Sequence, residues 1–268
     1  MSGFPDRNGY ALVTGGGARL GAAMVRRLAA DGWAVAIHYN KSGRAAEALA
    51  AEINSAGGRA QAQGVDLAAP DGFSDLFARA SAASGFCSLL VNSASAFEYD
   101  DATSITRASL ERLFAVNLHA PMLLARDFAA QLREGSKGLV VNILDQKVFN
   151  LNPDFLSYTL TKSALEAATR LLAQAMAPRV RVCGIAPGLT LRSGDQTQEG
   201  FEKAHAATPL GFGSGPDDIA EALSFLTRVP SITGTTIIVD GGQHLEARSH
   251  DVMFSYGIGP DAPVGRKR

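Results

Sequence analysis

Short runs of aliphatic and β-branched residues alternate with longer Ala- and Leu-rich stretches along most of this 268-residue chain. The apolar runs are typical of strands covered on both faces, and the longer stretches are typical of helices. Alternating strands and helices form βαβ units, in which the strands are parallel and helices cover both faces of the sheet. The pattern therefore predicts one doubly wound α/β domain with about seven parallel strands.

The positions of these elements follow from the same pattern. We expect strands at residues 10–14, 34–40, 60–66, 88–92, 138–144, 180–186 and 235–240. We expect helices at residues 21–31, 45–56, 109–133, 157–177 and 216–228. No long polar linker and no internal repeat divides the alternation, so residues 1–248 are expected to form a single domain.

Two segments lie outside the alternation. Residues 191–215 follow the sixth strand, are polar and Gly-rich, and are predicted to form a mobile loop over a substrate. Residues 249–268 follow the last strand and end in Gly-Arg-Lys-Arg. This tail is interpreted either as a loosely ordered end or as a segment that packs on a neighbouring subunit.

Charge and cysteine content exclude several classes of protein. The 25 Lys and Arg residues nearly balance the 26 Asp and Glu residues, so no net field favours nucleic acid or an anionic membrane. We find no signal-peptide pattern and no run of about 18 apolar residues, and therefore expect a soluble cytoplasmic protein. Cys87 and Cys183 lie in apolar runs and are expected to be buried strand thiols. No residues have metal-ligand spacing, so no metal is predicted.

A glycine-rich turn joins the first predicted strand to its helix. Residues 14–21 read TGGGARLG, which gives the spacing Gly-x-Gly-x-x-x-Gly. Glycines at this position let the backbone turn tightly and approach a pyrophosphate, which rests on the helix N-terminus. The turn predicts a nucleotide site, and its candidate cofactor residues are Gly15, Gly17, Arg19, Leu20 and Gly21.

The residues after the second strand indicate which nucleotide binds. An NAD site usually has Asp or Glu there for the ribose 2′-OH, but residues 38–42 read HYNKS and contain no carboxylate. Lys41 and Ser42 would hold a 2′-phosphate, so we predict NADPH as the cofactor. Asp66, which closes the third strand, is interpreted either as a contact to the adenine amine or as a helix cap. The candidate residues here are His38, Tyr39, Asn40, Lys41, Ser42 and Asp66.

Tyr158 and Lys162 lie four residues apart in a predicted helix and therefore share one face. An ammonium beside a phenol stabilises the phenolate, so we expect the pKa of Tyr158 to be lowered. A tyrosine near its pKa can deliver a proton to a carbonyl or imine that receives hydride. Together with the glycine turn, the pair predicts a nucleotide-dependent reductase.

With these motifs, residues 10–245 resemble the short-chain dehydrogenase/reductase family. Further matches are residues 92–95 (NSAS), Asn117, residues 186–188 (APG) and residues 240–242 (DGG). The resemblance implies a Rossmann-like domain, usually assembled as a tetramer. It implies that Tyr158 is the acid, that Lys162 contacts the nicotinamide ribose and the tyrosine, and that Asn117 holds a proton-relay water. The implied further cofactor contacts are Asn92, Ala94, Ser95, Pro187 and Gly188.

Two departures from the family's common pattern are informative. Arg19 stands in the turn where glycine is usual, and Asp145 stands thirteen residues before Tyr158, where serine is usual. A serine there donates a hydrogen bond to a substrate carbonyl, whereas a carboxylate cannot donate unless it is protonated. A carboxyl group can instead help to protonate a ring nitrogen. Asp145 is also open to a structural interpretation, as a residue that forms the turn at a strand end.

These departures, the HYNKS stretch and Phe97 resemble the pteridine reductase and dihydromonapterin reductase branch of the family. The resemblance implies that Phe97 stacks the pterin against the nicotinamide, although a loop aromatic can also plug a core. It implies that Ser95 hydrogen-bonds the pterin or a cofactor phosphate, and that Arg19 lies between the pyrophosphate and the pterin oxygen. The implied substrate-binding residues are Arg19, Ser95, Phe97, Asp145, Tyr158, Leu189 and Thr190.

The expected reaction is the NADPH-dependent reduction of a dihydropterin, such as 7,8-dihydromonapterin, to the tetrahydropterin. A general carbonyl reductase acting on a 3-oxoacyl thioester is one alternative, against which Asp145 argues. An NADPH-binding regulator without catalysis is the other, against which Asn117, Tyr158 and Lys162 argue. We expect His205 and His244 to be solvated and assign them no role.

Overall fold

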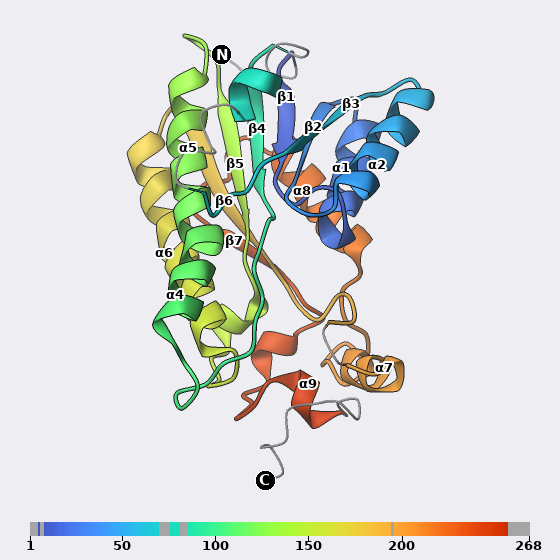
Figure 1. Ribbon diagram of the computed structural model, residues 1–268, viewed down its shortest axis with the longest axis vertical. Helices are drawn as coiled ribbons and strands as arrows, with labels where there is room; N and C mark the ends of the chain where they lie inside the picture. Colours follow the sequence, from blue (N-terminus) through green and yellow to red (C-terminus); the bar gives the residue numbers. More distant parts are fainter. Residues whose placement is uncertain (1–4, 6–7, 70–75, 81–84, 194–195, 257–268) are drawn as a thin grey trace.

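A seven-stranded parallel sheet in the order β3-β2-β1-β4-β5-β6-β7 forms the centre of the protein. The structure is a computed structural model, and it describes residues 5, 8–69, 76–80, 85–193 and 196–256. Helices lie on both faces of the sheet (Figure 1). The predicted fold class, a doubly wound Rossmann-like sheet, is confirmed.

Every predicted strand has a counterpart, with ends that differ by two residues or fewer. The strands are β1 (Tyr10–Val13), β2 (Ala34–Tyr39), β3 (Arg59–Gly64), β4 (Cys87–Asn92), β5 (Gly138–Ile143), β6 (Val180–Pro187) and β7 (Thr236–Val239). The strand order reverses between β1 and β4. In doubly wound proteins, ligands bind in the crevice outside the carboxyl ends of the strands at this reversal.

The helices divide into three groups. On one face lie α1 (Arg19–Ala30), α2 (Gly43–Ser55) and α8 (Pro216–Arg228). On the other lie α4 (Arg107–Phe114), α5 (Ala120–Gln131) and α6 (Leu156–Met176). Two short helices, α7 (Gln198–Ala206) and α9 (Val252–Ser255), lie beyond the carboxyl end of the sheet (Figure 1). Residues 76–80 are also helical.

The core consists of two layers because successive side chains of a strand point to opposite faces. Val13 and Val91 belong to the cluster that includes residues of α1, α2 and α8. Leu12 and Leu90 belong to the opposite cluster, with Phe128 of α5. Burying each of these side chains contributes about 1.5–3 kcal/mol, which fixes the strand register and the position of every strand end.

The long helix predicted at residues 109–133 is interrupted, so that prediction is wrong in detail. A π-helical segment, η1 (Ala115–His119), separates α4 from α5. Pro121 lies in the first turn of α5, where a missing N–H costs little. Single π turns inside helices are frequently found at functional sites, and this one contains the buried side chain of Asn117.

The two segments outside the predicted alternation also contain helices. In residues 191–215, Thr197 caps α7 by accepting a hydrogen bond from the Gly200 amide, so the segment is not a continuous loop. In the tail, α9 packs its buried Met253 on this chain, so residues 249–256 are not a loose end. Residues 194–195 and 257–268 lie outside the described residues.

Several remaining predictions can be compared directly. Cys87 and Cys183 are free and buried in β4 and β6, as predicted. Among the described residues, no helix is both long and apolar enough to cross a membrane. Within the same part of the chain, no group of three or more His, Cys, Asp or Glu side chains is placed to hold a metal ion.

Candidate active site

The glycine turn lies at the sheet's switch point and is closely packed. Gly15 has φ +64°, and a Cβ there would lie 2.9 Å from the Cα of Ala94 in the segment after β4. A Cβ on Gly21 would lie 2.1 Å from the carbonyl oxygen of Gly15. Glycine is therefore required at both positions, and the backbone is left open to a pyrophosphate at the start of α1.

A cavity of about 370 Å³ lies beside this turn. It brings together eight of the predicted cofactor residues with three others from the segments after β3 and β4 and from η1. Its lining consists of Gly15, His38, Asn40, Lys41, Ser42, Asp66, Leu67, Ala94, Ser95, Ala96 and Val116. A cavity at the strand-order reversal with an ammonium, a hydroxyl and amides on its wall fits the nucleotide end of a dinucleotide.

Lys41 and Ser42 have the geometry of an anion site. Lys41 is exposed, and Ser42 is the residue that immediately precedes α2. The Ser42 side chain makes no capping hydrogen bond in the described structure, so its hydroxyl is available to a ligand. The helix N-terminus, the hydroxyl and the ammonium all favour an anion, as the predicted 2′-phosphate requires.

Asp66 forms a turn after β3, whereas the sequence left open a contact to adenine or a helix cap. Its Oδ1 accepts a hydrogen bond from the Ala68 amide at 2.9 Å, which stabilises the local turn. It also accepts a long hydrogen bond from Asn40 Nδ2 at 3.4 Å. The residue also lines the cavity, and its contact with an adenine amine stays a prediction.

His38 supports the glycine turn from inside the protein. Its Nδ1 accepts a hydrogen bond from the Gly15 amide at 3.1 Å, and its Nε2 therefore donates to the Val65 carbonyl at 2.9 Å. Burial lowers the pKa of His38, so the ring is neutral at physiological pH. Both ring nitrogens are used within the protein, which makes His38 a support for the cavity wall rather than a phosphate ligand.

Tyr39 and Leu20 are predicted cofactor residues whose side chains pack against other parts of the protein. Tyr39 lies on the opposite face of β2 from His38, and its ring packs against Gly43 and Gly64, where a Cβ would approach it to 3.0 and 2.9 Å. Leu20 is half-buried and packs against the core cluster of α1 and α8. In both cases the aromatic or aliphatic side chain fixes a neighbouring element, and cofactor contact stays a prediction.

Buried amides and a hydroxyl fix the end of β4. Asn92 Nδ2 donates to Asn142 Oδ1 at 2.8 Å, so this predicted cofactor residue lies inside the sheet. Thr14 Oγ1 accepts hydrogen bonds from the Ser93 and Ala94 amides at 2.9 and 3.0 Å. Thr14 was not among the predicted site residues, and its position at the end of β1 was the available signal.

Asn117 clamps the segment that follows β4. Its Nδ2 donates to the Ala96 carbonyl at 2.9 Å, and its Oδ1 accepts from the Ala96 amide at 2.7 Å. It also donates to Thr161 Oγ1 at 3.1 Å, which ties η1 to α6. Ser95 Oγ donates to the same Oδ1 at 3.3 Å. The predicted relay-water role of Asn117 stays a prediction, and the structure adds this positioning role.

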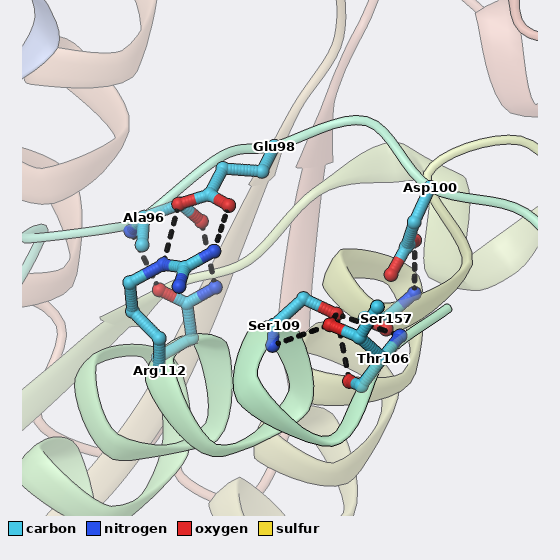
Figure 2. A network of polar contacts seen from close by, with 8 residues as sticks. Ala96, Glu98, Asp100, Thr106, Ser109, Arg112 and Ser157 are labelled. Carbon is cyan, nitrogen blue, oxygen red and sulfur yellow. Dashed lines mark hydrogen bonds and ion pairs between the residues drawn. The ribbon is translucent and has the colours of Figure 1, made fainter. Parts of the chain in front are cut away.

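Figure 2 shows how the same segment is fixed further along. Glu98 pairs with Arg112 of α4, with a distance of 2.7 Å between Oε1 and Nε. Asp100 Oδ1 accepts a hydrogen bond from the Ser157 amide at the start of α6, at 2.9 Å. Phe97 lies between anchored neighbours, so its ring is held in one place on the site.

Asp145, Tyr158 and Lys162 come together at the carboxyl end of β5. The Tyr158 hydroxyl donates to Asp145 Oδ2 at 2.8 Å. Lys162 Nζ donates to the Ile143 carbonyl at 2.8 Å and lies 5.7 Å from the centroid of the Tyr158 ring. Asp145 Oδ1 also accepts from the Lys147 amide, so the turn-forming interpretation of Asp145 is correct as well.

Burial is the largest influence on the pKa values of Asp145, Tyr158 and Lys162. It raises the pKa of Tyr158 well above its ordinary value, and the neighbouring Asp145 carboxylate raises it further. It raises the pKa of Asp145 and lowers the pKa of Lys162 to about 8. The prediction that Lys162 lowers the pKa of Tyr158 is therefore wrong for this arrangement. At neutral pH the phenol keeps its proton and can act as a donor.

Phe97 gives the site an open aromatic face. Its ring stacks on Phe155, with centroids 4.5 Å apart and planes inclined by 22°. The edge contact with Tyr158 has a centroid distance of 4.8 Å. Phe97 is nevertheless 42% exposed, so it does not plug the core. An exposed ring beside a phenol donor is a surface on which a flat heteroaromatic molecule can stack.

Two residues at the edges of the site have strained backbones. Arg19 has φ +51° at the start of α1, and Phe155 has φ +54° immediately before α6. Residues with a Cβ rarely adopt this left-handed conformation, which costs about 1–3 kcal/mol and is concentrated at functional sites. Arg19 Nη2 donates to the Arg192 carbonyl at 3.0 Å and so connects the glycine turn with the segment after β6.

The segment after β6 is held against the end of β7. Pro187 is the last residue of β6, and the amide of Gly188 donates to the Val239 carbonyl at 2.9 Å. Leu189 donates its amide to Gln243 Oε1 at 3.0 Å, and Thr190 is buried. The sequence does not reveal the contact of Gln243 with Leu189, because a lone glutamine in a loop carries no chemical signal.

The expectation that two histidines are solvated is wrong. His244 Nδ1 lies 2.8 Å from Asp240 Oδ2. His205 Nδ1 accepts a hydrogen bond from the Gly213 amide at 3.2 Å, and its Nε2 contacts the Ser214 carbonyl at 3.2 Å. Both rings stabilise loops at the carboxyl end of the sheet, which the sequence around them does not reveal.

Comparison with known proteins agrees with this geometry. A family model described as short chain dehydrogenase matches residues 9–202. The crystal structure of FolM alternative dihydrofolate reductase 1 from Brucella suis in complex with NADP is 45% identical, with a TM-score of 0.87, and the match covers 90% of this chain and 97% of that one. The chain belongs to the short chain dehydrogenase family, and it is an oxidoreductase.

Two relatives show how substrates vary within the family. Pteridine reductase 1 of Leishmania tarentolae is 31% identical over 88% of this chain and 96% of that protein. A 3beta-hydroxysteroid dehydrogenase 1 of Eggerthella lenta is also 31% identical, over 87% of this chain and 93% of that protein. The first similarity, with that to the Brucella protein, is consistent with the branch that the sequence resembles. The second shows that overall identity does not select the substrate.

Proposed function

We propose that this protein uses NADPH to reduce a dihydropterin, such as 7,8-dihydromonapterin, to the tetrahydropterin. The observation that carries the proposal is the hydrogen bond from the Tyr158 hydroxyl to Asp145 beside the exposed ring of Phe97. This arrangement combines a stacking surface with a phenol that holds a proton and a carboxyl group that can take one up. A flat ring that contains a C=N bond needs both features.

The cofactor site fits NADPH better than NADH. The glycine turn leaves room for the pyrophosphate, and Lys41 and Ser42 line the cavity where a 2′-phosphate would lie. Arg19 extends from the same turn and would meet the pyrophosphate or the substrate oxygen, as its sequence position suggests. When bound, NADPH would supply the hydride.

The residues of this chain control the proton. Tyr158 keeps its proton because burial and Asp145 raise the pKa of the phenol. In the described geometry the phenol donates to Asp145 Oδ2, and rotation about the C–O bond turns the same O–H toward a ring nitrogen above Phe97. Because burial also raises the pKa of Asp145, its carboxyl group takes up a proton more readily than an exposed aspartate.

Lys162 supports this group from the opposite side. Its buried ammonium is held by the Ile143 carbonyl, next to the Tyr158 ring. In that position it can hold the ribose of the cofactor and offset the negative charge of Asp145. By family resemblance we also propose that the protein is a cytoplasmic homotetramer, which sedimentation analysis would test.

A general carbonyl reductase is the second candidate. The family relationship and the Tyr158–Lys162 pair support it. Asp145 argues against it, because a carboxylate at this position accepts the Tyr158 hydrogen bond and offers no donor to a ketone oxygen. The two candidate functions therefore require different roles of the Asp145 side chain.

The proposal is tested by following NADPH absorbance with purified protein and three substrates: a 7,8-dihydropterin, dihydrofolate and a 3-oxoacyl thioester. We expect rapid oxidation with the dihydropterin and at least about tenfold lower kcat/KM with the thioester. Oxidation with the thioester alone would refute the proposal in favour of the carbonyl reductase. NADPH binding without turnover of any of the three would favour the regulator.

A further inference from the structure

Three phenylalanine rings form a continuous stack that begins at the site and ends in the tail. Phe97 stacks on Phe155 at 4.5 Å, and Phe155 stacks on Phe254 at 5.8 Å with planes inclined by 11°. We call these three rings the aromatic stack. Tyr99 packs its edge against both Phe155 and Phe254 and closes one side of it. The position of the exposed Phe97 ring therefore depends on rings behind it.

The last ring of the stack is contributed by α9. Asp251 precedes this helix, and its Oδ1 accepts a hydrogen bond from the Met253 amide at 3.0 Å. The amide of Asp251 donates to Asp154 Oδ2 at 2.7 Å, in the segment before α6. Met253 and Phe254 pack with Phe155 and Tyr158 in one cluster. The tail thus reaches the site within the same chain.

Lys147 connects the segment around α9 with the turn that contains Asp145. It lies in the short 3-10 helix Gln146–Phe149 and is 3% exposed. Its Nζ lies 2.8 Å from Asp251 Oδ2 and 5.2 Å from the centroid of the Phe155 ring. Its backbone amide donates to Asp145 Oδ1 at 2.9 Å.

A buried ammonium requires such partners. A lysine that loses contact with water is stabilised only when a carboxylate and further favourable contacts replace its hydration. Here Asp251 supplies the carboxylate, and the face of Phe155 supplies a cation–π contact. The ammonium therefore lies between the segment that precedes α9 and the middle ring of the aromatic stack.

We propose that Lys147 is a positioning residue for the substrate. Its contacts with Asp251 and Phe155 hold α9 against the aromatic stack and so fix the open face of Phe97. The inference rests on the proposed function, in which that face receives the flat ring of the substrate. The backbone amide of Lys147 donates to Asp145, and the Lys147 charge is the smallest of the influences on the Asp145 pKa, which it lowers. Its ammonium contacts Asp251 and Phe155, so Lys147 positions the substrate site through these neighbours.

Replacement of Lys147 with methionine tests this role. Methionine keeps the length of the side chain and removes its charge, and Asp251 keeps access to water because its side chain is 19% exposed. We expect Lys147→Met to raise KM for the dihydropterin about tenfold, to change kcat by less than about threefold, and to leave KM for NADPH unchanged. Lys147→Arg, which keeps the ion pair and the cation–π contact, should restore most of the affinity.

The kinetic experiment includes a matched control variant and a second variant that disrupts the aromatic stack directly. Lys137→Met removes the same charge from a lysine that immediately precedes β5, at the amino end of the sheet, where its Nζ donates to the Pro178 carbonyl, and it should change none of these constants. Phe254→Ala removes the last ring of the stack without touching the ion pair and should raise KM for the substrate as Lys147→Met does. Combined with Lys147→Met, it should add less than the sum of the two effects, because both act through the same stack.

Hydrogen–deuterium exchange gives a readout that needs no substrate. We expect Lys147→Met to increase amide exchange in residues 246–256, with no change in the glycine turn. Faster exchange there with an unchanged substrate KM in both Lys147→Met and Phe254→Ala would overturn the positioning role. A rise in KM for NADPH equal to that for the substrate would also overturn it.

Failure of the proposed function can be told apart from failure of this inference. If the wild-type protein reduces a ketone and no dihydropterin, the proposed function fails, and the KM values are measured with that ketone. An unchanged ketone KM in Lys147→Met then overturns the inference, and a raised KM that Lys147→Arg restores supports it.

Discussion

The cofactor side and the substrate side of the crevice are formed by different kinds of residue. On the cofactor side, mostly small or polar residues line the cavity, and Gly15 and Gly21 let the β1–α1 turn pack tightly. On the substrate side, the aromatic stack and the Tyr158–Asp145 pair come from segments far apart in the chain. The cofactor side contains motifs that can be recognised locally in the sequence, whereas the aromatic stack is visible only as contacts between distant segments.

This difference separates the expected effects of substitutions. Changes on the cofactor side should alter which nucleotide binds and leave the chemistry in place. Changes on the substrate side should alter proton delivery and substrate choice and leave nucleotide binding in place. Each of the following changes tests whether nucleotide binding and proton delivery depend on separate residues.

The largest effect is expected from Tyr158→Phe. The change removes the hydroxyl that donates to Asp145 and that would protonate the substrate, so turnover should fall about 10²-fold or more. NADPH affinity, measured by nicotinamide fluorescence, should stay nearly constant. Tyr99→Phe removes a tyrosine hydroxyl from the same aromatic cluster, one that donates to Asp101, and serves as the matched control with near-normal turnover. Unchanged turnover in Tyr158→Phe would remove Tyr158 from the mechanism.

Asp145→Ser is expected to change substrate choice. Serine provides a donor suited to a ketone and removes the carboxyl group whose pKa is raised by burial. Turnover of a dihydropterin should fall about 10- to 100-fold, and any ketone side activity should fall less or rise. The ratio of kcat/KM for the two substrates measures this directly. Equal losses on both substrates would show that Asp145 has no special role in pterin reduction.

On the cofactor side, Lys41→Ala should weaken NADPH binding about tenfold and leave NADH binding unchanged, because the proposed partner of the ammonium is the 2′-phosphate, which NADH lacks. Titration with both nucleotides measures this effect. Lys137→Ala is the matched control, since Lys137 immediately precedes β5 at the amino end of the sheet, away from the cavity. An equal loss for the two nucleotides would show that Lys41 contacts a part of the cofactor that both share.

The smallest effect is expected in the pH profile. Burial lowers the pKa of Lys162 from 10.5 to about 8, so the ammonium is present below about pH 8 and is lost as the pH rises through that value. If charged Lys162 is needed, kcat/KM should fall about fivefold between pH 8 and pH 9. A flat profile up to pH 10 would show that the charge of Lys162 is not needed for the reaction.

The sequence predicts the strands, most helices and the location of the nucleotide site, because periodicity and the glycine turn are local signals. It also groups Asp145, Tyr158 and Lys162 correctly, because Tyr158 and Lys162 share one helix face and the family resemblance adds Asp145 to them. It does not reveal that Phe254 and Lys147 pack against Phe155, since their partners are distant in the chain. It also gives the wrong direction for the pKa of Tyr158, because burial is not visible in a spacing.

Transfer of deuterium from NADPH deuterated at nicotinamide C4 directly tests whether the protein transfers hydride to a dihydropterin. The protein is incubated with the labelled cofactor and a 7,8-dihydropterin, and the product is analysed by mass spectrometry. The account predicts a tetrahydropterin that carries one deuterium on a ring carbon. Unchanged dihydropterin, together with deuterium in the alcohol formed from a 3-oxoacyl thioester, would contradict it.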